Sequence, residues 1–165
     1  MTSAFLEKLS SYNLLNYLLP GVIFSFIVSN VTSFSLIQGD LLVGAFLYYF
    51  IGMIISRLGS LIIEPVYKRL GIVSYSDYSD YVAASNQDKK LEVLLETNNT
   101  YRTFVSLFIA VVVTKLYELL VQNCSFFSSY GDLLLVLLLF LLFSFSYSKQ
   151  TGYIKSRVDK YKDNS

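Results

Sequence analysis

The chain has 165 residues and a formal net charge of +1, with 54% hydrophobic and only 15% charged residues. A soluble domain has about 25% charged residues, so this chain has too little polar surface to cover a soluble core. A near-neutral chain also has no global basic field for nucleic acid, and we expect no direct contact with nucleic acid. The length permits one domain.

The cysteine and histidine content excludes several kinds of chemistry. The chain has no His, and Cys124 is its only Cys. Internal disulfides, zinc sites of the Cys/His type and His-based catalytic triads or dyads are therefore excluded. No nucleophile–base pair or carboxylate cluster is evident either. We expect no enzymatic activity and no cofactor, and we assign no catalytic, cofactor-binding or metal-binding residue.

Four apolar segments are long enough to cross a bilayer as helices, which takes about 20 mostly apolar residues. In chain order they lie at about 14–35, 41–63, 104–121 and 130–147. The first is the least apolar, because it contains Asn16, Pro20-Gly21 and Asn30. No cleavage site follows it, so we expect a retained span and not a signal peptide. The predicted fold class is all-α, a polytopic membrane protein with four transmembrane helices and short cytoplasmic helices.

Lys and Arg residues predict how these spans are oriented. The short connections 36–40 and 122–132 contain none, whereas the connection 64–103 and the tail 148–165 contain five each. Positively charged flanks stay in the cytoplasm. With four spans, both basic segments and both termini fall on the same side, so we expect both termini to be cytoplasmic and the short loops to lie outside.

The connection 64–103 is too long for a plain turn and contains helical patterns. We single out its apolar and aromatic residues as a candidate docking surface: Tyr78, Tyr81, Leu91, Leu94 and Leu95. Short amphipathic helices lying on the bundle or the headgroups are one interpretation, and docking of a soluble partner or a neighbouring subunit is another. A third interpretation is one long helix over residues 88–121 whose first part projects into the cytosol.

Three charged residues fall inside the predicted spans and are candidate functional residues: Arg57, Lys115 and Glu118. Lys115 and Glu118 are three residues apart, so their side chains can meet on one helix face. They could form a mutual pair near the outer interface, line a polar cavity or pore, or contact another subunit. Arg57 lies in the inner third of its span, where it could reach lipid phosphates or act at the cytoplasmic mouth. Because Arg57 and Lys115 differ in depth, we expect two separate sites.

The second span also carries small residues at intervals of four: Gly52, Ser56 and Ser60. Such a stripe allows two helix backbones to approach closely in a bilayer. The partner could be a helix of the same chain or of a second subunit. A four-span chain of this size buries few residues, so we also expect self-association.

Three runs, LLNYLLPGVIF, IGMIISRLGSLIIEPVYKRLG and DKKLEVLLETNNTYRTF, resemble small four-span inner-membrane proteins of bacteria. Some of these proteins are encoded beside anti-phage defence genes. The resemblance implies the bacterial inner membrane and a non-enzymatic, oligomeric sensor, effector or anchor for a soluble cytoplasmic partner. It transfers no functional residue. The alternative hypothesis is a small channel or pore-forming protein with Arg57, Lys115 and Glu118 near a polar path.

Overall fold

The computed structural model describes residues 13–85 and 87–163, leaving aside the side chains of residues 78, 79 and 160–163. Over these residues the regular structure is entirely helical. The elements are the π-helix η1 (Leu14–Leu18), α3 (Leu19–Val31), α4 (Leu41–Leu58), the π-helix η2 (Gly59–Ile63), α5 (Glu64–Arg69), α6 (Tyr78–Ser85), α7 (Lys90–Asn123) and α8 (Ser125–Asp163).

Four helical stretches in the described part of the chain are long and apolar enough to cross a membrane. They are Leu14–Val31, Leu41–Arg69, Lys90–Asn123 and Ser125–Asp159. The predicted all-α class with four helices of spanning length is therefore confirmed. The second stretch is one continuous helical path, since η2 follows α4 directly and α5 follows η2.

The last two helices are longer than a bilayer requires. α7 has 34 residues and α8 has 39, which correspond to about 51 Å and about 58 Å at 1.5 Å per residue. The apolar segment expected at 104–121 is the C-terminal part of α7, and the one expected at 130–147 lies in the N-terminal half of α8, so both helices extend mainly at the ends away from the α7–α8 turn. Of the three interpretations of residues 64–103, the long projecting helix matches α7. No Gly or Pro interrupts its sequence, so nothing ends the helix at the edge of the apolar segment.

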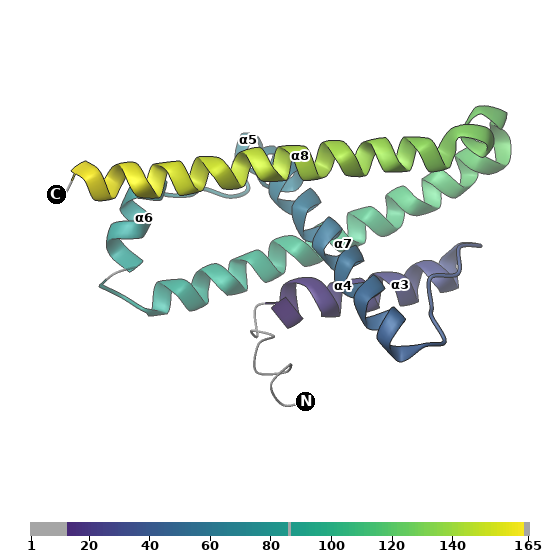
Figure 1. Cartoon of the computed structure of the whole chain (residues 1–165), viewed down its shortest axis with the longest axis horizontal. Helices are drawn as coiled ribbons and strands as arrows, with labels where there is room; N and C mark the ends of the chain where they lie inside the picture. The colour runs from purple at the N-terminus through teal and green to yellow at the C-terminus, as the bar shows by residue number, and fades with distance from the viewer. Residues whose placement is uncertain (1–12, 86, 164–165) are drawn as a thin grey trace.

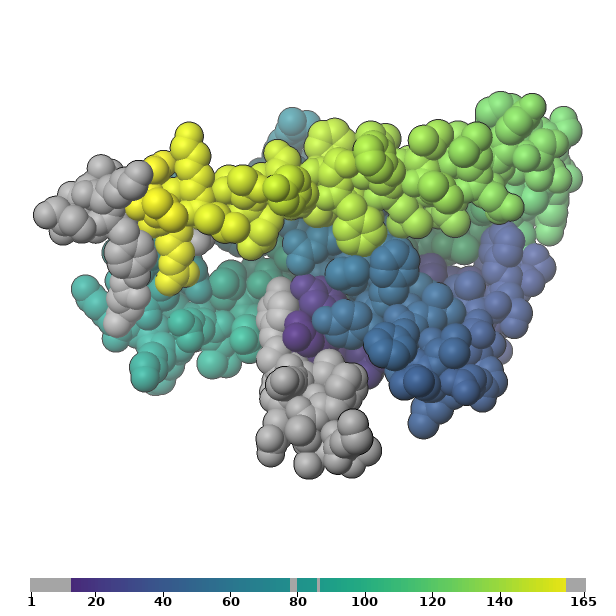
Figure 2. Space-filling view, in the orientation of Figure 1, coloured from purple at the N-terminus to yellow at the C-terminus, as the bar shows by residue number. Residues whose placement is uncertain are grey.

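α3, α7 and α8 run roughly along the long axis of the molecule, whereas α4 and α6 lie across it (Figure 1). α7 and α8 form a long hairpin, α3 lies along the Asn123 half of α7, and α4 crosses between them. The α3–α4 connection lies at the same end of the molecule as the α7–α8 turn, where Phe34 stacks on Tyr117 at 6.2 Å. α6 contacts both α7 and α8 at the other end. In the space-filling view α8 forms an outer ridge along the molecule (Figure 2).

Two glycines bring α4 into backbone contact with the first span. A Cβ added at Gly21 would collide with the carbonyl of Tyr48, and one added at Gly52 would collide with the carbonyl of Tyr17. Only glycine permits this approach. Asn16 is buried beside the crossing, with 1% of its surface exposed. The polar and helix-breaking residues of the first span therefore form its contact with α4.

Both π-helices end two residues before a proline, Pro20 after η1 and Pro65 after η2. A proline in an α-helix lacks an amide hydrogen and collides with the carbonyl four residues earlier, and a wider π turn relieves the collision. In η2 the amide of Glu64 donates to the carbonyl of Gly59, five residues back. The next donor in that register would be Pro65, which has none. The carbonyl of Ser60 is thus left without a backbone donor.

Candidate functional site

A cluster of charged side chains gathers where η2 and α5 meet the C-terminal helices. The carboxylate of Glu64 lies 2.5 Å from Arg102 Nη1 of α7, 3.1 Å from Lys68 Nζ of α5 and 3.7 Å from Lys149 Nζ of α8. Only 10% of the Glu64 side chain is exposed. Glu64 therefore connects α5 to α7 and α8 through ion pairs that are largely shielded from solvent. We call these four residues the Glu64 cluster.

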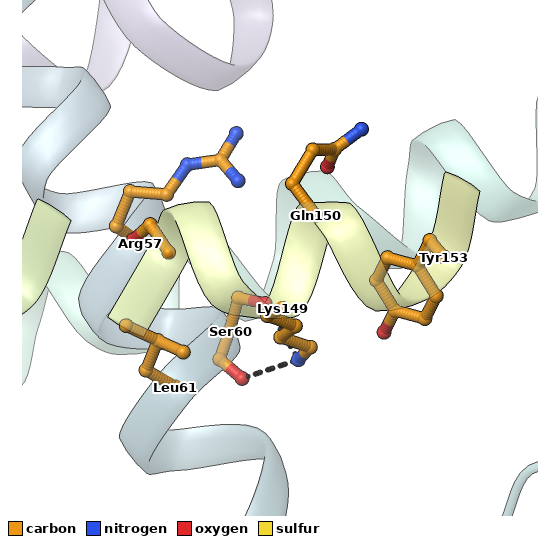
Figure 3. Close-up of a pocket in the computed structure, with 7 residues that line it drawn as sticks. Arg57, Ser60, Leu61, Lys149, Gln150 and Tyr153 are labelled. Atoms are coloured by element: carbon orange, nitrogen blue, oxygen red, sulfur yellow. Dashed lines mark hydrogen bonds between the residues drawn. The ribbon is translucent and has the colours of Figure 1, made fainter. Parts of the chain in front are cut away.

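Lys149 also compensates for the interrupted backbone of η2. Its ammonium group donates to the carbonyl and to the hydroxyl of Ser60, each at 2.8 Å. Figure 3 shows the hydroxyl contact. This carbonyl is the one that Pro65 leaves without a backbone donor. Lys149 therefore replaces the backbone hydrogen bond that is missing between the π turn and Pro65. It attaches α8 to the second span.

Arg57 lies next to the Glu64 cluster but has a different partner. Its Nη2 donates to the hydroxyl of Tyr17 at 3.0 Å, and among the ion pairs of the described residues none includes Arg57. Arg57 and Ser60 line a small opening between the second span and α8, together with Leu61, Ser146, Lys149, Gln150 and Tyr153. In Figure 3 the guanidinium of Arg57 and the amide of Gln150 point to the same side of α8.

The charges in this region do not balance. Arg57, Lys68, Arg102 and Lys149 are four cations, and Glu64 is the carboxylate among them. The Nε of Arg102 is buried and has no hydrogen-bond partner. Four positive charges against one negative leave an excess of three among these five residues, so their immediate surroundings attract anions.

Lys115 and Glu118 make contacts at the C-terminal end of α3, far from Arg57, whose partner Tyr17 precedes α3. Lys115 Nζ lies 2.6 Å from a carboxylate oxygen of Glu118 and donates to the carbonyl of Val31 at 2.8 Å. The other carboxylate oxygen accepts the backbone amide of Ser33. Carbonyls at a helix C-terminus lack intrahelical partners, and Val31 is the last residue of α3. The pair therefore holds the end of α3 against α7 within one chain.

The two charged sites lie at opposite ends of the first span. The partner of Arg57 is Tyr17, and the partner of Lys115 is Val31. These partners are 14 residues apart, or about 21 Å at 1.5 Å per residue. The structure does not bring Arg57 together with Lys115 and Glu118.

Each member of the small-residue stripe contacts a different part of the same chain. Gly52 lies against the backbone of η1. Ser56 accepts a long hydrogen bond of 3.5 Å from Thr103 of α7, and Ser60 binds Lys149 of α8. Of the two partners left open by the sequence, the intramolecular one accounts for all three contacts.

The candidate docking residues lie around the contact between α6 and α7, away from Arg57. Tyr81, Leu91 and Leu95 are half-buried there, whereas Leu94 is 62% exposed. The side chain of Tyr78 lies outside the described residues. The exposed apolar residues of this region include Val93 as well, at 63%.

Sequence reasoning missed the Glu64 cluster. Its signal was the position of the charges relative to the spans, because Arg102 comes just before the third apolar segment and Lys149 just after the fourth. Glu64 follows the second apolar segment directly. Charges that flank different spans on one side of a membrane come to the same level and can pair. Among the described residues, no group of three or more His, Cys, Asp or Glu side chains could hold a metal ion.

Comparison with protein-family models, curated proteins and solved structures gives no match for this chain.

Proposed function

We propose that the protein is a non-enzymatic multi-pass membrane protein that contacts a soluble partner at one membrane face, as an anchor, sensor or effector. The observation that carries this proposal is the length of α7 and α8. They exceed a hydrocarbon core of about 30 Å by roughly 21 and 28 Å. The parts of α7 and α8 away from the α7–α8 turn carry charged residues together with exposed apolar ones.

The contact region is the projecting module, which we define as α6 with residues 90–101 of α7 and 150–159 of α8. α6 contacts both helices, and its Val82 is 6% exposed. Four large aliphatic side chains of the module are exposed: Val93 at 63%, Leu94 at 62%, Ile154 at 58% and Val158 at 47%. Exposed apolar groups outside a bilayer favour a protein contact, with a soluble protein or a second copy of the chain.

Charge and packing support the membrane part of the proposal. Only 6% of the 18-residue apolar stretch of α8 is buried inside the chain. Contact with lipid would remove the rest of this apolar surface from water. The projecting module is on the basic side, which we assign to the cytoplasm of a bacterial cell. Arg57, Lys115 and Glu118 bind groups of the same chain, an arrangement that does not favour a channel.

Photo-crosslinking in cells tests the partner. A photoreactive residue at Leu94 should give a discrete protein adduct, whereas the same residue at Leu138, 63% exposed on the apolar part of α8, should give none with soluble proteins. An adduct of twice the chain mass identifies self-association instead. Because of the resemblance to proteins beside anti-phage defence genes, cells are compared before and during phage challenge. No adduct from Leu94, Val93 or Ile154 in either condition contradicts the proposal.

The single cysteine tests the membrane topology. Cys124 lies at the α7–α8 turn, so a membrane-impermeant thiol reagent should label it in cells with an intact inner membrane. A chain with Cys124→Ser and Ser156→Cys moves the thiol to the projecting part of α8 and should be labelled only after lysis. The reverse pattern overturns the orientation, and release of the chain by alkaline carbonate overturns membrane insertion.

A further inference from the structure

We propose that the opening between the second span and α8, lined by Arg57, Lys149 and Gln150, binds the phosphate of an anionic lipid headgroup at the basic membrane face. This inference rests on the membrane part of the proposed function and is independent of the soluble partner. Its starting point is the excess of three positive charges around Glu64.

The depth of the opening fits a headgroup. Arg57 is 16 residues from Leu41, where the second predicted span begins, and Lys149 is 19 residues from Tyr130, where the fourth begins. These separations are about 24 and about 28 Å along a helix, close to the thickness of a hydrocarbon core of about 30 Å. Both cations therefore reach the boundary where lipid phosphates lie. Basic pockets between transmembrane helices at this level are suited to anionic headgroups.

The donors around the opening fit a phosphate. The Arg57 guanidinium has five N–H donors in a planar fork that matches phosphate oxygens, and its hydrogen bond to the Tyr17 hydroxyl uses Nη2. The Gln150 amide points to the same side and is exposed. The ammonium group of Lys149 already donates hydrogen bonds to Ser60. Lys149 therefore attracts the phosphate through its charge and keeps its contacts with Ser60.

Neutralisation by Glu64 does not extend to Arg57. The carboxylate accepts from Arg102 and Lys68 and lies 3.7 Å from Lys149, so its two oxygens are already shared among three cations. A partly buried arginine at a low-dielectric boundary costs free energy without a counter-anion. A lipid phosphate is the anion that is always present at this depth.

The test uses the full-length chain purified in an uncharged detergent. Native mass spectrometry follows the titration of phosphatidylglycerol, with phosphatidylcholine and inorganic phosphate as separate arms. One phosphatidylglycerol per chain should bind at least about tenfold tighter than phosphatidylcholine, because both carry the phosphate but the quaternary ammonium of phosphatidylcholine cancels its charge and is repelled by the excess cations. Inorganic phosphate that binds as tightly as phosphatidylglycerol identifies a free-anion site and overturns the lipid source.

Three variants locate the site. Arg57→Gln should weaken phosphatidylglycerol binding about tenfold. Gln150→Ala, which leaves the contacts of the Glu64 cluster and of Arg57 with Tyr17 intact, should weaken it about threefold. Arg157→Gln, the matched control, removes one charge from an exposed position farther along α8 and should change binding less than twofold. Equal losses for Arg57→Gln and Arg157→Gln, with unchanged melting temperatures, show nonspecific attraction and overturn the proposal. A failed crosslink at Leu94 leaves this result untouched.

Discussion

The first span and α8 are the two extremes of packing in this molecule. In the first span, 33% of an 18-residue apolar stretch is buried inside the chain. In α8 the buried share of an apolar stretch of the same length is 6%. The packed span is the one with Asn16, Pro20 and Gly21, and the unpacked one is the most hydrophobic. The difference follows from the solvent. Apolar side chains gain little by exchanging lipid for protein, so small residues and polar contacts decide which helices pack closely.

α8 is consequently held at a few points. Its Phe143 stacks on Phe50 of α4 with ring centres 6.0 Å apart, and Lys149 binds Ser60 and Glu64. The first three spans instead pack through close backbone contacts at Gly21 and Gly52 and through hydrogen bonds between buried polar groups such as Asn16 and Thr103.

Glu64→Gln tests whether the cluster attaches α8 to the bundle. The change leaves Arg102, Lys68 and Lys149 without a counter-charge, and removing one partner of a buried ion pair costs about 3–5 kcal/mol. The free energy of unfolding in mixed micelles should fall by about that amount. Glu96→Gln on the exposed side of α7 is the control and should be nearly neutral. Equal effects would mean that the cluster does not stabilise the fold.

Alanine at two helical glycines contrasts the packed region with α8 directly. Gly52→Ala places a methyl group against the backbone of Tyr17, which cannot yield like a side chain, and should lower the free energy of unfolding by about 1–3 kcal/mol. At Gly152 of α8 nothing lies within 4 Å of an added Cβ. Gly152→Ala should raise stability by up to about 1 kcal/mol through helix propensity. Thermal unfolding of both variants checks the opposite signs.

Threonine-to-valine changes isolate the polar contacts of the packed region. Thr103 is fully buried and its hydroxyl lies 3.4 Å from Asn16, 3.5 Å from Ser56 and 2.8 Å from the Asn99 carbonyl. Thr103→Val should cost about 1 kcal/mol, since buried hydrogen bonds in membranes are worth little more. Thr151→Val removes the same type of bond, to the Tyr147 carbonyl, from an exposed position. A loss as large for Thr151→Val would contradict the contrast.

Phe143→Ala tests the aromatic contact of α8. Loss of the stack on Phe50 should cost about 0.5–1.5 kcal/mol, and limited proteolysis should show α8 loosened while the first three spans stay protected. Phe140→Ala is the control, because Phe140 is 67% exposed on the same helix and should give an unchanged digest.

The sequence predicts the four helices and the Lys115–Glu118 pair well, because both depend on local spacing. The first span is the least apolar of the four, as expected, but hydropathy does not reveal that its Asn16 is buried beside Thr103 in the bundle. The length of α7 was left open because hydropathy marks the membrane boundary, whereas a helix ends only where backbone or capping signals stop it. The Glu64 cluster depends on contacts between residues such as Glu64 and Arg102, 38 apart in the chain. No local pattern encodes such a pair.

The π turn η2 also determines the direction in which the Glu64 side chain points. A π turn holds one residue more than the α-helix around it, so it behaves as a one-residue insertion that leaves the flanking helix phases aligned. If η2 relaxed to an α-helix at constant length, the residues after it would rotate by about 100°. Glu64 would then turn away from Arg102 and Lys149. Pro65 disfavours the narrower α turn and thus keeps the Glu64 carboxylate directed toward Arg102 and Lys149. Deletion of one residue within GSLII would keep the phase of the charged end, but it would place Pro65 in an α-helix, where its ring collides with the carbonyl four residues earlier.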